Sequence, residues 1–403
     1  MEGQAYRDPR EAIEAIAASL LAAPLPTNLD ASLASGHSGL ALFHAYAAAY
    51  FHSEAHRDRA ELHAVAAGEL ADALVDVGLY SGLAGVGWCL SHLASEFELE
   101  VDLSALDDLD ESILELLRHA APDSLEFDLT RGLSGIAVYA AERGQGDVIR
   151  QIYGLIYQRL AESAIHDPRG TFWRRRLAWM PAHVRNRFSD GAIDLGLAHG
   201  TPGVIGTLAL VAQHLSHPNA ARHLVSGAIE WMRTQRRGGL HPARIAHDDM
   251  VTMPDRNAWC YGELGIAAAM SLAADIFGEG RWKEYTISSL ITQDDLLNGI
   301  TDPTLCHGAG GALQILNRLM SRHREPRLEL LHRATLRQLL GFRNLSFLGG
   351  FSTRAIRSDN IEEVWAENTT LLLGTAGIGL ALISELRPDL SGWDRVLMIS
   401  RSS

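Results

Sequence analysis

The sequence contains few cysteines and has no apolar run long enough to cross a membrane. Three cysteines in 403 residues cannot form a disulfide framework. The most apolar stretch, residues 371–384 (LLLGTAGIGLALIS), is shorter than the roughly 20 residues that span a bilayer. The start, MEGQAYRDPREA, lacks the apolar core of a secretory signal. These absences exclude a disulfide-rich secreted domain and a membrane span, and we expect a cytoplasmic protein.

Excess positive charge is also lacking. The chain has 35 basic and 49 acidic side chains, a net charge of −14 with neutral histidines. Net charge therefore does not attract nucleic acid or an anionic membrane surface. Hydrophobic residues make up 47% and charged residues 21%, which is typical of a soluble globular chain with a large core. Aromatic residues make up only 7%, whereas alanine, leucine and glycine recur throughout, which favours helices packed closely through small residues.

A glycine motif recurs along the whole chain. Seven times, a short turn is followed by Gly-x-x-Gly or a close variant and then by an apolar helical run. The first glycines, which we call motif glycines, are Gly36, Gly82, Gly132, Gly200, Gly262, Gly308 and Gly374. Their spacing of 46 to 68 residues accommodates two helices of ~12 residues each, with loops. We expect a positive φ or a close backbone approach at each motif glycine.

The repeats predict one all-α domain over residues 1–403. Amphipathic stretches such as 57–75 and 219–233 lie between the motifs, and no alternating run long enough for a sheet is present. Repeated helix pairs form an open solenoid or close into a ring. Seven apolar helices fit an inner ring surrounded by seven amphipathic outer helices, an α/α toroid. In such a ring all seven turns gather at one end, with the helix N-termini pointing there.

Candidate metal ligands occur at equivalent positions of these turns. Cys260 and Cys306 each lie two residues before a motif glycine, and His199 and His307 each lie one residue before one. Two thiolates with one or two imidazoles suit tetrahedral Zn²⁺ and leave a position for water or substrate. The alternative is that the two cysteines are small buried residues at tight turns. Cys89, on an apolar helical run, is predicted to be a core thiol.

Three motifs in order resemble one family. LAHGTPG (197–203), WCYG (259–262) and CHG (306–308) are similar to motifs of lanthionine synthetase C-like proteins, the cyclase family of lanthipeptide biosynthesis. The resemblance implies an α/α toroid whose zinc ligands are Cys260, Cys306 and His307. It also assigns non-ligand functional roles to Asp128, His199, Arg256 and Tyr261. Glu263-Leu264 stands where many relatives have a proline, which only pre-sets a helix start. The chain resembles the stand-alone cyclase, because it has no additional dehydratase region of several hundred residues.

Such a site has a definite chemistry. Coordination to Zn²⁺ deprotonates a thiol whose free pKa is ~8.5. A thiolate of the precursor peptide then adds to dehydroalanine or dehydrobutyrine and forms a (methyl)lanthionine thioether. The enolate that results needs positive charge, which Arg256 and the helix N-termini supply, and a proton, for which His199 is the best donor by residue type. The expected partners are a dehydrated precursor peptide and a separate lanthipeptide dehydratase.

Each assignment has an alternative. Asp128 also fits a helix cap, His199 a metal ligand or supporting histidine, Arg256 a surface ion pair and Tyr261 a packing residue. His37, inside the first motif, would face the site, whereas His183 and His241 receive no role. Two other functions compete with the cyclase. One is a prenyltransferase-like zinc toroid, which needs basic residues for a diphosphate, and the other is a non-catalytic module that binds glutathione or a peptide thiol.

The longest gap between motifs contains an elaborated segment around residues 165–190. Within TFWRRRLAWMPAHVRNRF (171–188), five arginines and two tryptophans concentrate positive charge in an otherwise acidic chain. They are Arg174, Arg175, Arg176, Arg185, Arg187, Trp173 and Trp179. The segment is either a solvated surface whose arginines pair with local acids or a rim that contacts a peptide.

Overall fold

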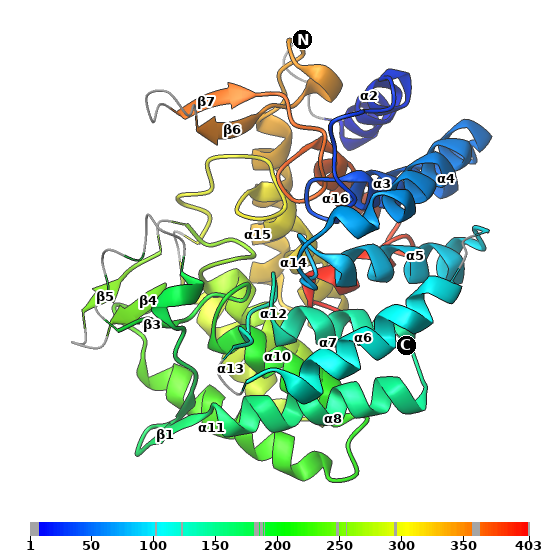
Figure 1. Ribbon diagram of the computed structural model, residues 1–403. Coiled ribbons are helices and arrows are strands. Elements are labelled where there is room, and N and C mark those ends of the chain that lie inside the picture. Colours follow the sequence, from blue (N-terminus) through cyan, green and yellow to red (C-terminus); the bar gives the residue numbers. More distant parts are fainter. Residues whose placement is uncertain are drawn as a thin grey trace. The chain divides into compact units, whose positions relative to one another are not determined.

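The computed structural model describes residues 8–100, 103–121, 124–180, 185, 188, 190–246, 250–254, 256–293, 296–356 and 363–401. Contacts divide the chain into two compact units. Unit 1 contains residues 1–76, 80–103 and 300–394, and unit 2 contains 77–79, 104–299 and 395–403. Each unit is built mainly of helices (Figure 1). The single domain over 1–403 stays a prediction.

A helix follows every motif glycine, and the glycine is its N-cap residue. These motif helices are buried on almost all sides, as expected for inner helices. In the described chain they are α3 (His37–Phe51), α5 (Leu83–Phe97), α7 (Leu133–Arg143), α10 (Thr201–Ala212), α12 (Glu263–Phe277), α14 (Ala309–Arg322) and α16 (Thr375–Leu386). The sequence prediction of seven apolar helices is confirmed.

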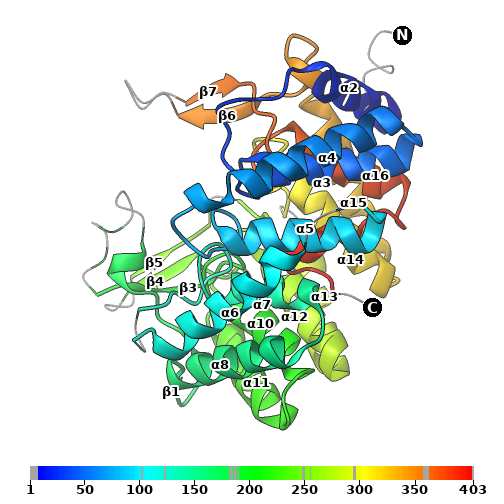
Figure 2. The same cartoon turned by 45° about the vertical axis from the view of Figure 1, so that its right-hand side comes forward.

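A second set of helices is buried on one side only. On α6, for example, Leu106, Ile113 and Leu117 are buried, whereas Asp107 and Glu111 are exposed. This set comprises α2 (Pro9–Ala22), α4 (Glu54–Glu69), α6 (Ser104–His119), α8 (Asp147–Glu162), α11 (Pro218–Thr234), α13 (Gly280–Ile291) and α15 (Pro326–Gly341). Within unit 1, α4 packs on α3, α15 on α14 and α2 on α16. Within unit 2, α8 packs on α7, α11 on α10 and α13 on α12 (Figure 2).

Short strands and 3₁₀ turns connect the helices. The strands are β1 (Ile165–Asp167), β2 (Gly170–Phe172), β3 (Ala192–Asp194), β4 (Arg244–Ala246), β5 (Val251–Thr252), β6 (Thr353–Ile356) and β7 (Glu363–Ala366). They form three small antiparallel sheets, in the orders β1-β2, β3-β4-β5 and β6-β7. The 3₁₀ turns are η1 (Ala71–Ala73), η2 (Leu177–Trp179), η3 (Leu348–Gly350) and η4 (Gly392–Leu397). Strands of two to four residues are too short to give an alternating pattern, so the sequence did not indicate them.

Backbone hydrogen bonds link the turns of successive repeats. In unit 1, the amide of Cys306 donates to the carbonyl of Leu372 at 3.1 Å, and Leu372 donates to Ala34 at 3.1 Å. Ala34 donates in turn to Tyr80 at 2.9 Å, so the turn of the last repeat is bonded to the turn of the first. In unit 2, Leu129 donates to Ala198 and Ala198 to Cys260. Equivalent turn positions are therefore neighbours within each unit, as the repeats predicted.

Close approach of two backbone segments explains why the turns need glycine. A Cβ on Gly200 would lie 2.0 Å from the carbonyl oxygen of Asp194, a distance that no side chain tolerates. Gly262 differs from the other motif glycines because its φ is +96°, which disfavours any residue with a Cβ. The two expected reasons for glycine thus apply at different turns.

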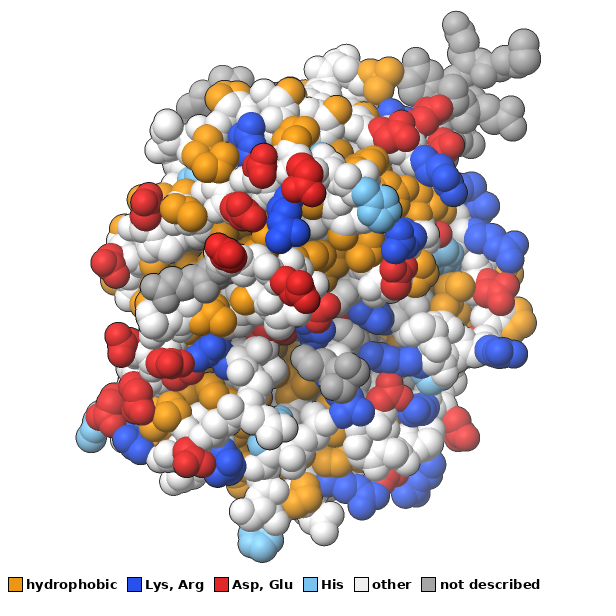
Figure 3. All heavy atoms as spheres, turned by 90° about the vertical axis from the view of Figure 1, so that its right-hand side faces the viewer, with side chains coloured by type: hydrophobic (Ala, Val, Ile, Leu, Met, Phe, Trp, Pro, Cys, Tyr) orange, Lys and Arg blue, Asp and Glu red, His pale blue; other side chains and the backbone are white. Residues whose placement is uncertain are grey.

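Both signs of charge are interspersed over the face shown in Figure 3. Within the described part of the chain, no helix combines the length and the apolarity that crossing a membrane requires.

Candidate functional site

A polar residue six positions before the motif glycine shapes most of the turns. Asp30, Asp194, Asp302 and Asn368 each accept, through Oδ1, the amide hydrogen of the residue two positions later. The fifth repeat departs from this pattern, because Arg256 occupies the position. There Asn257 closes the turn instead, with its Oδ1 accepting from the amide of Glu263 at 3.1 Å. The offset of six was present in the sequence but became meaningful only with the turn geometry.

The sixth turn presents Cys306 and His307 beside a buried carboxylate. His307 is 27% exposed, and its Nε2 lies 3.3 Å from Oδ2 of Asp302. Asp302 is fully buried, and its Oδ1 accepts from the amide and the hydroxyl of Thr304 at 2.8 and 2.6 Å. A carboxylate at one ring nitrogen orients the imidazole and leaves Nδ1 as the nitrogen for a metal. Sequence reasoning did not single out Asp302.

One group in the described residues has the donor atoms of a metal site. Cys260, Cys306 and His307 each offer one ligand atom, and these three atoms lie within 4.8 Å of one another. Among the described residues, no other set of three or more His, Cys, Asp or Glu meets this condition. Two sulfurs and one nitrogen suit tetrahedral Zn²⁺ with one position open, so the residues fit the metal that the sequence predicted.

Asp128 and His199 form a close pair in unit 2. Nδ1 of His199 lies 2.7 Å from Oδ2 of Asp128, and since a carboxylate only accepts, Nδ1 donates and Nε2 is the second ring nitrogen. The Asp128 side chain is fully buried, whereas that of His199 is 25% exposed. Burial alone raises the pKa of Asp128, but the hydrogen bond and charge of His199, together with Arg175, hold it below its ordinary value. Asp128 is thus a fixed anion that orients His199.

The alternative role of Asp128 as a helix cap is wrong. The N-cap of α7 is Gly132, which has no side-chain cap hydrogen bond. Asp128 instead accepts the amide hydrogen of Arg131 at 2.8 Å and the hydroxyl of Thr130 at 2.8 Å, which closes the turn before the helix. Oδ2, which accepts the Thr130 hydroxyl, also accepts from Nδ1 of His199.

Arg175 overturns one expectation for the arginine-rich segment. Only 4% of this residue is exposed, so it belongs neither to a solvated surface nor to a peptide-contacting rim. Its Nε lies 2.5 Å from Oε1 of Glu126 and its Nη2 lies 3.3 Å from Oδ2 of Asp128. Burial and the neighbouring charge of Asp128 raise the pKa of Glu126, which Arg175 opposes. Two buried carboxylates need a buried cation, and the backbone bridge from Arg175 to Ala192 holds it there.

The other residues of that segment are distributed differently. Trp173 is buried, and its indole N–H donates to the carbonyl of Leu160 at 2.8 Å. Arg174 and Trp179 are half-buried and Arg176 is exposed. Arg185 is exposed and donates to the carbonyls of Ala178 and Met180. Arg187 and His183 lie outside the described residues.

Tyr261 takes part in a polar network as well as packing. Its hydroxyl donates to Oδ2 of Asp194 at 2.8 Å, and Arg244 donates to the phenol oxygen. Arg244 also lies 3.1 Å from Asp194 and 4.7 Å above the Tyr261 ring. Burial and the charge of Asp194 raise the pKa of Tyr261, so the phenol keeps its proton. The ring centroid of Tyr261 lies 6.0 Å from that of His199.

Of the remaining residues considered in the sequence analysis, Arg256 lies in the turn of Cys260, whereas His37 and Cys89 are buried. Arg256 is half-buried in the turn that carries Cys260. His37 is not directed to the site, because its Nδ1 lies 2.9 Å from Nδ1 of His63 on α4 and both rings are buried. Cys89 is a core thiol as predicted, since it is fully buried and donates to the carbonyl of Ser38.

Glu263, the first residue of α12, has a structural role. Its buried carboxylate accepts from the amide of His241 at 2.6 Å and contacts Nδ1 of the same residue at 2.9 Å. His241 is therefore a satisfied core histidine, consistent with the absence of any predicted role. Glu263 therefore anchors the loop that contains His241 to the start of α12.

The chain was compared with known sequences, protein families and solved structures. No curated protein sequence matches the chain. Among solved structures, nisin cyclase matches with a TM-score of 0.73 at 19% sequence identity, over 92% of each chain. This likeness confirms the predicted fold class, an all-α α/α toroid. A family model described as lanthionine synthetase C-like protein matches residues 27–398. Because that match covers most of the sequence, the chain belongs to the lanthionine synthetase C-like family.

Proposed function

We propose that this protein is a zinc-dependent lanthipeptide cyclase. Cysteine thiolates of a dehydrated precursor peptide add to dehydroalanine or dehydrobutyrine and form (methyl)lanthionine rings. The observation that carries the proposal is the group of Cys260, Cys306 and His307, whose ligand atoms lie within 4.8 Å of one another. Membership of the lanthionine synthetase C-like family and the similarity to nisin cyclase support the same reaction.

The three ligands fit a metal that activates a thiol. Zn²⁺ bound there supplies deprotonation of a substrate cysteine at neutral pH, where a free thiol is only a few per cent ionised. Two thiolates of the protein and a neutral imidazole already balance the double positive charge. A substrate thiolate therefore keeps high electron density on sulfur. None of the three cysteines forms a disulfide, which agrees with a reducing, cytoplasmic location.

His199 is the proton donor in this proposal. When sulfur bonds to the β-carbon of the dehydro residue, the C=C π pair moves to the α-carbon and its carbonyl, forming an enolate. Nε2 of His199 then delivers a proton to the α-carbon, and the proton that the substrate thiol loses returns to Nε2 of His199. Asp128 holds Nδ1 at 2.7 Å and stabilises the imidazolium, because its own lowered pKa keeps it ionised.

Arg256 and Tyr261 stabilise and orient the enolate. Arg256 replaces the acidic or amide residue found at the same turn position in other repeats, so a cation stands where the fold otherwise uses an acceptor. Positive charge near a developing oxyanion lowers the barrier. Tyr261 keeps its proton, and Asp194 with Arg244 fixes the ring, which makes Tyr261 a positioning residue beside His199.

The test is ring formation by the metal-loaded protein. Ring closure does not change mass, so the measurement is loss of free thiols toward alkylation in a dehydrated precursor, with zinc content measured in parallel. Wild-type protein should contain about one zinc per chain and consume thiols. Cys306→Ala should lose both properties, and Cys89→Ala, which changes a core thiol, should retain both.

Three outcomes decide between the candidate functions. Full zinc retention by Cys306→Ala would show that the ligand assignment is wrong. Zinc-dependent binding of the peptide thiol without ring closure would replace the cyclase with a thiol-binding module. Alkylation of the same thiol by an isoprenoid diphosphate would instead identify a prenyltransferase. The precursor used must be dehydrated beforehand, because the reaction consumes dehydro residues.

A further inference from the structure

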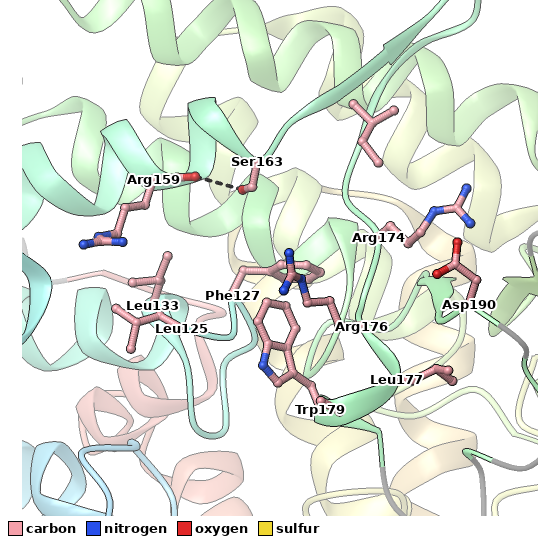
Figure 4. A pocket seen from close by; sticks show the side chains of 12 residues that line it. Leu125, Phe127, Leu133, Arg159, Ser163, Arg174, Arg176, Leu177, Trp179 and Asp190 are labelled. Atoms are coloured by element: carbon pink, nitrogen blue, oxygen red, sulfur yellow. Dashed lines mark hydrogen bonds between the residues drawn. The ribbon is translucent and has the colours of Figure 1, made fainter. Parts of the chain in front are cut away.

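A cavity of about 560 Å³ opens in unit 2 next to the Asp128 turn. Phe127, which forms part of its wall, directly precedes Asp128 in the chain. Most of the wall comes from the first turn of α7, the end of α8 and the arginine-rich segment after β2, and Leu125, Ile165 of β1 and Asp190 complete it (Figure 4). None of the proposed ligands or proton-transfer residues lines this cavity. It is therefore a binding space separate from the reacting atoms, joined to them through the backbone at Phe127 and Asp128.

Apolar and aromatic side chains form one part of the wall. Phe127 is buried, and the half-buried ring of Trp179 meets it edge to face at a centroid distance of 6.0 Å. Leu133, Leu177 and Ile165 extend the apolar surface. Aromatic and aliphatic side chains around a concave space are typical of sites that take an apolar side chain.

Two guanidinium groups add positive charge to this wall. The Arg176 guanidinium lies 5.7 Å from the Trp179 ring centroid, and Figure 4 shows it beside Phe127 and Trp179. Arg174 also lines the cavity, and among the described residues no hydrogen bond or ion pair engages its guanidinium. Arg159 differs, because it already donates to the carbonyls of Leu117 and Ala120. In a chain of net charge −14, this wall has the opposite sign.

Asp190 limits which ligand fits. It lies on the Arg174 side of the cavity in Figure 4, so a run of acidic residues would meet a carboxylate there. A single carboxylate near Arg176, followed by an apolar side chain on Phe127 and Trp179, satisfies both parts of the wall. A small free anion would leave the apolar part uncovered.

We propose that this cavity binds an acidic residue with an adjacent aromatic or aliphatic residue of the peptide substrate, outside the residues that form the rings. The inference rests on the proposed function in taking a precursor peptide as the ligand. Binding there holds the peptide while its cysteines reach the ligand group. The arginines act by charge complementarity, which salt screens beyond ~8 Å at physiological ionic strength.

The direct test uses two fluorescein-labelled pentapeptides, Gly-Asp-Phe-Leu-Gly and Gly-Asn-Phe-Leu-Gly, with zinc-loaded protein and fluorescence anisotropy. We expect the acidic peptide to bind about tenfold more tightly at low salt, a preference that shrinks at high salt. Arg176→Glu and Arg174→Glu should abolish the preference, and Trp179→Ala should weaken both peptides. Arg10→Glu, a charge reversal at an exposed position of α2 in unit 1, is the matched control and should behave as wild type.

Equal affinity for the two peptides in the wild type, or an unchanged preference in Arg176→Glu, would overturn the inference. With a dehydrated precursor, Arg176→Glu should raise KM and leave kcat and zinc content unchanged, and an unchanged KM would also overturn it. The outcome is independent of ring formation. If the protein prefers the acidic peptide but forms no rings, the cyclase proposal fails and the peptide site stands.

Discussion

Two sets of histidines in this protein have opposite surroundings. The first set lies between α3 and α4, where His37 pairs with His63 and His44 pairs with His56 through Nδ1 atoms 2.9 and 2.8 Å apart. The second set lies in the turns, where His199 and His307 meet the buried carboxylates of Asp128 and Asp302. The side chain is the same, but its partner is a second imidazole in one region and a carboxylate in the other.

The helix pairs hold their histidines neutral. In a hydrogen bond between two Nδ1 atoms one ring donates and the other accepts, so protonation of the accepting Nδ1 leaves two donors facing each other. Burial, with the neighbouring histidines and Arg59 adding to it, lowers the pKa of His44 to about 2. Burial with His37 and Arg59 lowers that of His63 to about 3. These residues contribute to packing and carry no charge at neutral pH.

The turn histidines remain partly exposed and each pairs with a buried carboxylate. A buried carboxylate fixes one ring nitrogen, and about a quarter of each side chain stays exposed. In the proposed function, Asp128 orients His199 for proton transfer, whereas Asp302 orients His307 for a metal. The comparison teaches that the partner of a histidine and its exposure, rather than burial of the turn itself, separate a site residue from a core residue. Four predictions follow from this difference, in decreasing order of effect.

The largest effect is expected for His199→Asn. Removal of a general acid typically lowers the rate 10²–10⁴-fold, while zinc should stay bound because His199 is not a proposed ligand. Thiol-consumption kinetics and metal analysis measure the two properties. His223→Asn, on the exposed surface of α11, is the control. Unchanged kinetics would remove His199 from the mechanism, and loss of zinc would make it a ligand.

Asp302→Asn should weaken zinc binding about 10–100-fold, since a carboxylate behind a ligating imidazole raises its basicity and fixes its orientation. Competition with a chromophoric chelator gives the affinity. Asp128→Asn is the matched variant, with a similar buried carboxylate paired to the other turn histidine, and should lower the rate without changing zinc affinity. Equal zinc affinities for the two variants would contradict the proposal that Asp302 supports the zinc ligand His307 and Asp128 supports His199.

The helix pairs should make stability depend on pH. The unfolded chain binds protons at histidine near pH 6.5, whereas folded His44 and His63 do so only near pH 2 and 3. The free energy of unfolding therefore falls as the pH decreases from about 6.5 toward 3, and these groups are neutral in both states above that range. Per histidine, the loss between pH 6.5 and 5 is up to about 2 kcal/mol.

The double variant His44→Leu, His56→Leu tests this dependence. Replacing both partners removes the titrating pair without leaving an unpaired imidazole. Urea unfolding at pH 7.5 and pH 5 should show a smaller loss of stability in the variant than in the wild type. An identical loss in the two proteins would mean that the pairs do not set the acid sensitivity.

The smallest effect is expected at an exposed histidine. His119 on α6 pairs with Glu115 at 3.0 Å, and both side chains are exposed. Exposed pairs gain little because water screens them. His119→Gln should leave the thermal unfolding midpoint within experimental error at both pH values. A clear shift would show that exposure does not discriminate among the histidines of this protein.

The repeats made the helices predictable. Two backbone segments approach each other closely at the turns, which requires glycine, and the recurring glycines can be recognised in the sequence. The cysteines and His307 were also predictable, since equivalent positions of a repeat come together. The partners of the site residues were not. Asp128 and His199 are 71 residues apart, and Glu126 and Arg175 are 49 apart, so nothing local in the sequence joins them. Arg175 was misassigned for the same reason, because a run of arginines does not reveal which one finds a buried acid.

The bonded turns of unit 1 have a consequence for synthesis of the chain. This unit joins residues 1–76 and 80–103 to residues 300–394, and the turn of the last repeat donates to the turn of the first through Leu372 and Ala34. The apolar faces by which α2 and α3 pack on α16 stay uncovered until that last helix has left the ribosome. Most of unit 2 is contiguous, from 104 to 299. The first repeats made are thus among the last to complete their packing, and their apolar faces stay exposed for most of translation.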